Sequence, residues 1–165
     1  MMADIMIRKR KRIRSKEAKA YSEEIERVLG VTLFTSDDAV DLAESSEFNV
    51  LFVNGEILAL VYQGKAFLTV RGLLKHRPQK KFVTVDMGAV PYVINGADIM
   101  MPGIVDADAG IEAGEMVWIR DVKNMVPLAI GVTSVSGEEM RKGGTGKVIK
   151  TVHNVGDKLW KTDEK

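Results

Sequence analysis

The segment Gly143-Gly-Thr-Gly-Lys147 has the residue types closest to a chemical site in this chain, because glycine-rich turns can cradle phosphate with backbone amides. The full phosphate-loop motif also places a glycine five positions before its last glycine and Ser or Thr after its lysine. Here Arg141 and Val148 occupy those positions, and a strand rather than a helix is predicted to follow. We therefore interpret the segment as a flexible turn that presents Arg141, Lys142 and Lys147, compatible with nucleic-acid contact.

The remaining polar residues do not assemble a catalytic centre or a metal site. The two histidines, His76 and His153, lie too far apart to form a spaced ligand pair, and the chain has no cysteine. Four aspartates lack the nucleophile or electrophile that acid–base chemistry needs: Asp86, Asp98, Asp106 and Asp108. Asp86 is expected to cap a helix, and His153 to be a hydrogen-bonded structural group or a stacking surface for a base. We expect no enzyme activity, no metal and no cofactor.

Positive charge is concentrated locally although the net charge is only +1. Six of the seven residues in the segment 8–14 are cationic, and an extended chain would place four arginines on one face: Arg8, Arg10, Arg12 and Arg14. Ile5, Ile7 and Ile13 would share the other face with two lysines. Clustered cations neutralise phosphates without reading sequence, so this comb is interpreted as a nucleic-acid anchor, with a merely solvated arm as the alternative. A second cluster comprises Arg71, Lys75, Arg77, Lys80 and Lys81.

The elements that position these residues divide the chain into two predicted domains, 1–80 and 81–160. The first is mixed α+β, with a strand at 5–14, a helix capped by Ser15 and ending at Gly30, and a short helix at 37–43. A hairpin at Asn54-Gly55 and a basic helix at 71–76 ended by Pro78 follow. The second has short apolar strands separated by glycine, as in a small barrel. The apolar runs are too short to cross a membrane, and we expect a cytoplasmic protein.

The most informative segment spans residues 86–104. A short helix begins near Pro91, with apolar positions at Ala89, Val90, Val93, Ile94 and Ala97; Gly96 ends it, and a strand runs from Asp98 to Met101 before Pro102-Gly103. The order Gly-Ala, helix, Asn-Gly-Ala-Asp-Ile-Met-x-Pro-Gly-Ile resembles the signature of the PUA domain, an RNA-binding module.

The resemblance extends along most of the chain. The segments 114–120, 127–132 and 146–160 are similar to the later strands of that module, and 51–58 with 73–78 resembles the pre-PUA domain of the malignant T-cell-amplified sequence proteins and their archaeal relatives. The resemblance implies an α+β pre-PUA domain followed by a PUA β-pseudo-barrel.

The resemblance also implies a non-catalytic role around translation, with structured RNA (tRNA or ribosomal RNA) as ligand and the small ribosomal subunit or an initiation factor as partner. Family RNA contacts fall on the helix-to-strand element and the last strand, which here are Asn95, Gly96, Ala97, Asp98, Met101, Pro102, Gly103, Lys147, Lys150 and His153. Two alternatives stay open: an RNA-targeting subunit of a modification complex, and a protein-interaction module in initiation or recycling.

Overall fold

A computed structural model describes residues 6–163 and divides the chain into two compact units. Unit 1 is Met1–Pro78 with Lys158–Lys165, and unit 2 is the continuous segment Gln79–Asp157. We describe each unit by itself. None of the described helices is long and apolar enough to span a bilayer.

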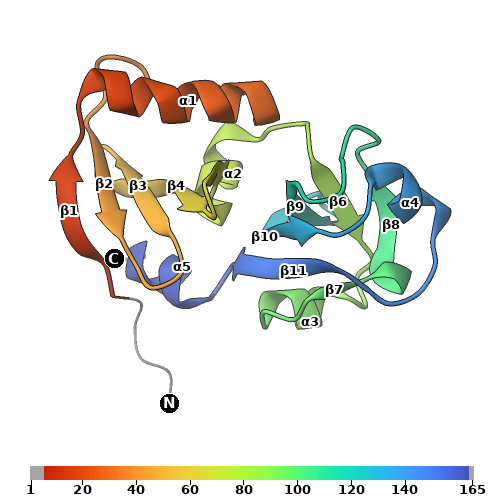
Figure 1. The fold of residues 1–165 in the computed structure, drawn as a ribbon. Helices are drawn as coiled ribbons and strands as arrows, with labels where there is room; N and C mark the ends of the chain where they lie inside the picture. Colours follow the sequence, from red (N-terminus) through yellow and green to blue (C-terminus); the bar gives the residue numbers. More distant parts are fainter. Residues whose placement is uncertain (1–5, 164–165) are drawn as a thin grey trace. The chain divides into compact units, whose positions relative to one another are not determined.

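Unit 1 is a five-stranded antiparallel sheet with helices packed against it (Figure 1). The sheet order is β1-β2-β3-β4-β5, so each strand pairs with its sequence neighbour. The elements are β1 (Arg8–Arg12), α1 (Ser15–Leu29), β2 (Val40–Glu44), β3 (Asn49–Val53), β4 (Glu56–Tyr62), β5 (Lys65–Leu68), α2 (Val70–His76) and α5 (Lys158–Asp163).

Local sequence explains several boundaries in unit 1. Helix α1 buries Ala18, Ile25 and Leu29 and ends as predicted at Gly30, which adopts a φ of 75° that glycine tolerates without a Cβ clash. The predicted hairpin is also present: Asn54 and Gly55 both have positive φ between β3 and β4, as a type I′ turn requires.

Two local predictions for unit 1 are wrong. The segment 37–43 is not a helix, because residues from Val40 onward form β2, which is held between β1 and β3 by hydrogen bonds on both edges. Ser15 does not cap α1; it is the first helical residue, and Arg14 occupies the N-cap position without a side-chain cap. Pairing within a sheet overrides weak local preference at such sites.

The C-terminal helix α5 belongs to unit 1. The guanidinium of Arg71 lies 4.0 Å from the Trp160 ring centroid, and Arg71 Nη2 donates to the Trp160 carbonyl at 3.2 Å. Unit 2 therefore ends at Asp157, whereas the predicted second domain ran to residue 160.

Unit 2 is built from six strands in the order β7-β11-β10-β9-β6-β8. Neighbouring strands are antiparallel except for the parallel pair β6 and β9. The elements are β6 (Phe82–Val85), α3 (Val90–Ile94), β7 (Ile99–Met100), η1 (Met101–Gly103), β8 (Ile104–Ala107), β9 (Met116–Asp121), β10 (Pro127–Thr133), α4 (Gly137–Lys142) and β11 (Lys147–Asn154).

The strand order shows that the sheet of unit 2 curls into a pseudo-barrel. Strands β7 and β8 lie at opposite ends of the order, yet only the three residues of η1 join them. Because a residue spans at most about 3.6 Å, the two edges must come within roughly 15 Å of each other. Curling encloses an apolar core that includes Val83, Val85, Ile119, Ala129 and Ile149, each fully buried. The predicted fold, an α+β domain followed by a β-pseudo-barrel, is confirmed.

Candidate nucleic-acid interface

The turn before α3 is organised by Asp86, whose Oδ1 accepts the Ala89 amide at 2.9 Å, and Pro91 lies in the first turn of the helix. The carboxylate thus fixes the turn before the helix, but the predicted cap is wrong, because the N-cap residue is Ala89 and has no side-chain cap. The helix is only five residues long, so the expected apolar face is incomplete: Val93 is buried, but Ile94 and Ala97 are exposed.

The loop after α3 is fastened to β11 by three hydrogen bonds. Asn154 Nδ2 donates to the Ile94 carbonyl at 3.0 Å, Thr151 Oγ1 donates to the Ala97 carbonyl at 2.9 Å, and the Thr151 amide donates to Asp98 Oδ1 at 2.9 Å. Gly96 takes a φ of 88° between these anchors. The loop is therefore held in one conformation by the strand beside it.

Strand pairing brings together the two segments named from the sequence. Met100 of β7 lies opposite Lys147 of β11, and Ile99 lies opposite Ile149. The helix-to-strand element and the last strand, about fifty residues apart in the sequence, are therefore neighbours (Figure 1). We call the exposed part of this region the β7–β11 face; it comprises Asn95, Gly96, Ala97, Pro102, Lys147 and Lys150.

Not every predicted contact residue is available on that face. Asp98 and Gly103 are half-buried. Met101 is 6% exposed and belongs to the core of unit 2, while His153 is 2% exposed. The His153 Nδ1 lies 2.8 Å from Asp157 Oδ2, so this histidine has the structural role that was one of its two predicted interpretations. We leave the Met101 and His153 side chains out of the face.

The face carries positive charge that is only partly neutralised. Lys147 Nζ lies 3.4 Å from Asp98 Oδ2, with the lysine side chain 60% exposed. Such an exposed pair is weak and can exchange with a phosphate. Across residues 6–163, Lys150 and Lys142 have no carboxylate within ion-pair distance, and both are exposed. The glycine turn 143–146 joins Lys142 to Lys147, so it does present cations as expected.

Sequence reasoning missed the exposed apolar residues of α3 and β7. Tyr92 is 70% exposed, Met100 51% and Ile94 40%. The outward position of Tyr92 and Ile94 follows from the burial of Val93, because neighbouring residues on a helix point to different sides, and Met100 alternates with the buried Ile99 along β7. An exposed aromatic ring such as that of Tyr92 is a surface on which an unpaired base can stack.

The N-terminal arginine comb is a strand, but its alternation is interrupted. Strand β1 pairs with β2 through a bulge between Arg8 and Lys11, and Lys9 has a φ of 54°. An extra residue on one strand shifts the side chains that follow it. The four arginines therefore do not form one regular row; the predicted apolar partner Ile5 lies outside the described residues.

Two of the comb arginines are engaged within unit 1. Both Arg10 Nε and Arg12 Nε donate to the Asp41 carboxylate, and Arg10 also lies 3.8 Å from the Phe52 ring centroid. The hydrogen bond from Arg12 is the largest cause that lowers the pKa of Asp41. Among the described residues, Arg8, Lys11 and Arg14 have no carboxylate partner, so these three are the available cations of β1 and its end.

The second basic cluster is mostly engaged locally. Lys75 Nζ lies 3.2 Å from Glu56 Oε1, and Lys81 Nζ lies 2.9 Å from Glu115 Oε1. Arg71 stacks on Trp160. Its members are divided between the two units. Within residues 6–163 no group of three potential ligands is arranged to hold a metal ion.

Comparison with known proteins is consistent with this geometry. Residues 81–155 match the model of the PUA domain, and residues 9–76 match a domain of unknown function, DUF1947. An uncharacterized protein of Methanocaldococcus jannaschii is 37% identical, covering 93% of this chain and 96% of the relative. Malignant T-cell-amplified sequence 1 of Danio rerio is 32% identical over 74% of this chain and 71% of its own length. The chain belongs to the PUA-domain proteins of the malignant T-cell-amplified sequence type.

Further relatives show how far the likeness reaches. Translation machinery-associated protein 20 of Schizosaccharomyces pombe is 36% identical over 67% of this chain, which spans 64% of that relative. A crystal structure of a hypothetical protein from Pyrococcus horikoshii superposes with a TM-score of 0.83 at 31% identity, over 94% of this chain and 99% of the other. Unit 2 is thus the PUA domain, and unit 1 contains the DUF1947 region.

Proposed function

We propose that this PUA-domain protein binds a structured RNA of the translation machinery, a tRNA acceptor stem or ribosomal RNA, without transforming it. The observation that carries the proposal is the pairing of β7 with β11, which brings Lys147 within 3.4 Å of Asp98 and holds the turn Asn95–Asp98 against the strand that also carries Lys150. Exposed cations can neutralise phosphates, and a glycine-containing turn lets backbone groups approach ribose closely.

The role in translation is supported by relatives named for that machinery. We propose a cytoplasmic location for the same reason, and the small ribosomal subunit or an initiation factor as partner. The absence of a nucleophile paired with a base near the face supports a non-catalytic role among the described residues.

The test compares lysines on and off the face. Lys147→Ala and Lys150→Ala should each weaken binding to a tRNA-like hairpin and reduce the preference for a duplex end over single-stranded RNA. Lys123→Ala is the matched control, because Lys123 is an exposed lysine of the same unit in the turn between β9 and β10. Losing one phosphate contact should lower the slope of log K against log[salt] by about 0.7–0.9.

The result that contradicts the proposal is equal binding and equal selectivity by the parent and both face variants, with thermal unfolding unchanged. An unchanged salt slope would remove the electrostatic part alone.

One observation favours a protein-interaction role as a second candidate. Three apolar side chains of the β9–β10 turn are exposed: Val122 at 40%, Met125 at 46% and Val126 at 39%. Clustered exposed apolar residues often mark a protein contact. Replacing Met125 by Ser should then weaken partner binding while leaving RNA affinity unchanged.

A further inference from the structure

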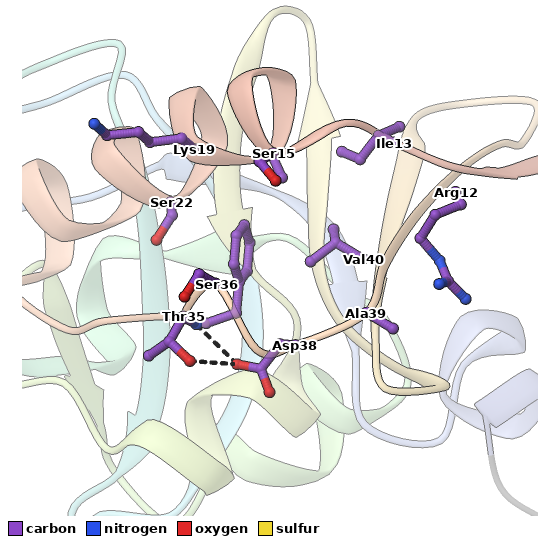
Figure 2. Close-up of a pocket in the computed structure, with 12 residues that line it drawn as sticks. Arg12, Ile13, Ser15, Lys19, Ser22, Thr35, Ser36, Asp38, Ala39 and Val40 are labelled. Carbon is purple, nitrogen blue, oxygen red and sulfur yellow. Dashed lines mark hydrogen bonds between the residues drawn. The ribbon is translucent and has the colours of Figure 1, made fainter.

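Unit 1 contains a pocket of about 460 Å³ between the first turns of α1 and the segment that leads into β2 (Figure 2). Its size falls within the range of small-ligand sites. Twelve residues line it, from the end of β1, from α1 and from residues 34–40. None of them was among the residues predicted from the sequence to bind RNA except Arg12.

The pocket combines an apolar floor with a hydroxyl-bearing rim. Ile13, Ala18 and Val40 are each less than 9% exposed, and the half-buried ring of Phe34 also lines the space. Figure 2 shows Ser15 and Ser22 on α1 across from Ser36. A nucleoside is bound by two kinds of surface: an apolar plane for the face of the base, and hydrogen-bonding groups for the edge of the base and the ribose. The floor and the rim supply these two surfaces.

The single carboxylate on the rim is already occupied by the protein. Asp38 Oδ2 accepts the Thr35 amide at 2.8 Å, and Asp38 Oδ1 accepts Asn54 Nδ2 at 2.8 Å. Asn54 Oδ1 in turn accepts the Ala39 amide at 2.8 Å. The hydrogen bond from the Thr35 backbone is the largest cause that lowers the pKa of Asp38. This network fixes the shape of the rim rather than offering Asp38 to a cation.

The charge around the pocket favours an anionic occupant. Arg12 and Lys19 line it; Arg12 Nε also donates to the Asp41 carboxylate, which is not part of the lining, but the Arg12 side chain is 66% exposed. Lys19 pairs with Glu23 at 3.7 Å, but both side chains are more than 60% exposed, so the pair is weak.

We propose that this pocket takes one unpaired nucleotide of the RNA, with the base against Phe34 and the apolar floor and its two flanking phosphates toward Arg12 at one end of the pocket and Lys19 at the other (Figure 2). The proposal rests on the RNA-binding function above. An acidic peptide fits less well, because the neighbouring edge strand β1 carries a bulge and a positive-φ residue that interrupt the regular ladder an added peptide strand needs.

The test uses the full chain and two oligoribonucleotides of equal phosphate number, one with seven uridines and one with seven abasic residues. Because the two strands carry equal charge, any difference in affinity between them is due to the bases. Stacking of one base corresponds to about 5- to 150-fold in affinity, and we expect the parent protein to prefer the base-containing strand by a factor in that range.

Two variants locate the preference. Ser22→Leu fills the pocket from α1 and should abolish most of the preference, whereas Ala20→Leu adds the same side chain at an exposed position of α1 outside the pocket lining and should retain it. Both changes suit a helix, and thermal unfolding is measured beside binding. A 4-thiouridine in the strand should crosslink within residues 12–22 or 34–40.

The result of this test is independent of the result for the β7–β11 face. Lys147→Ala with Lys150→Ala should leave the base preference intact even where duplex binding is lost. An equal preference in Ser22→Leu and the parent, or crosslinks confined to unit 2, overturns the pocket assignment. Displacement by polyglutamate with no contribution from the bases would overturn it in favour of an acidic protein.

Discussion

Replacing Gly131 by alanine should destabilise unit 2 because the strand that carries the face lysines passes too close for a Cβ. Gly131 lies in β10 opposite Thr151, where the pairing with β11 shifts register. An added Cβ would lie 2.4 Å from the Lys150 carbonyl oxygen and 2.7 Å from Ile149 Cγ2. One of those atoms is backbone, so the two strands must separate.

The expected cost combines two effects. Forcing a methyl group into packed space costs about 1–3 kcal/mol, and weakening one ladder hydrogen bond adds about 1 kcal/mol. The sum, about 2–4 kcal/mol, corresponds to a fall of roughly 8–30 °C in the unfolding temperature of a domain of this size. Because Lys150 moves with its carbonyl, RNA affinity should fall as well.

Each unit contains one tryptophan, so the assay can follow them separately. Trp118 lies in β9 of unit 2 and Trp160 in α5 of unit 1. In a Trp160→Phe background, intrinsic fluorescence during heating or urea titration reports unit 2 alone. Gly110→Ala is the control, since its Cβ would meet only Asp108 Oδ1 at 3.4 Å, an ordinary contact. If Gly131→Ala unfolds within about 0.5 kcal/mol of Gly110→Ala, the size usual for surface changes, the close approach of β10 and β11 described here is wrong.

Three further predictions concern the N-terminal strand and its anchor. Because the pKa of Asp41 is lowered in the folded state, the ionised carboxylate stabilises the fold fully above the unfolded-state pKa of about 3.9, and this stabilisation is lost as the pH falls below that value. Asp41→Asn should therefore lower the free energy of unfolding by about 1–2 kcal/mol at neutral pH and by little near pH 2, as measured by urea titration. Replacing Arg8, Lys11 and Arg14 by serine should leave the free energy of unfolding within about 0.5 kcal/mol of the parent and lower the slope of log K for RNA against log[salt] by about 2–3 in filter binding. An unchanged slope would mean that these cations are solvated and do not contact RNA. The converse pair, Arg10→Ser with Arg12→Ser, should lower the unfolding temperature, and no shift in calorimetry would contradict the ion pairs of these arginines with Asp41.

Features determined by a few neighbouring residues could be predicted from the sequence. The end of α1 at Gly30 and the hairpin at Asn54-Gly55 each depend on one local conformational preference, the positive φ that glycine and asparagine tolerate. The face was located through its resemblance to a family, and the pairing of Met100 with Lys147 agrees with that placement of its two segments.

Features decided by distant partners could not be predicted in the same way. Residues 40–44 form a strand because β1 and β3 flank them, and the alternation of the comb breaks at a bulge that only pairing with β2 defines. His153 is buried although it was expected to be able to face a base. Helix α5 joins unit 1 because Trp160 contacts Arg71, which lies 89 residues earlier in the sequence. The pocket at Phe34 gave no sequence signal because its walls come from two separate segments, residues 12–22 and 34–40.

The position of α5 has a consequence for synthesis of the chain on the ribosome. Translation proceeds from the N-terminus, and domains tend to fold as units when their residues have emerged. The continuous segment Gln79–Asp157 of unit 2 is complete before Lys158 is added, whereas unit 1 still lacks α5 at that moment. Unit 1 is therefore completed only by residues that emerge after unit 2, and a released chain truncated after Asp157 should contain a folded PUA domain and a first domain whose Arg71 has no Trp160 to stack on.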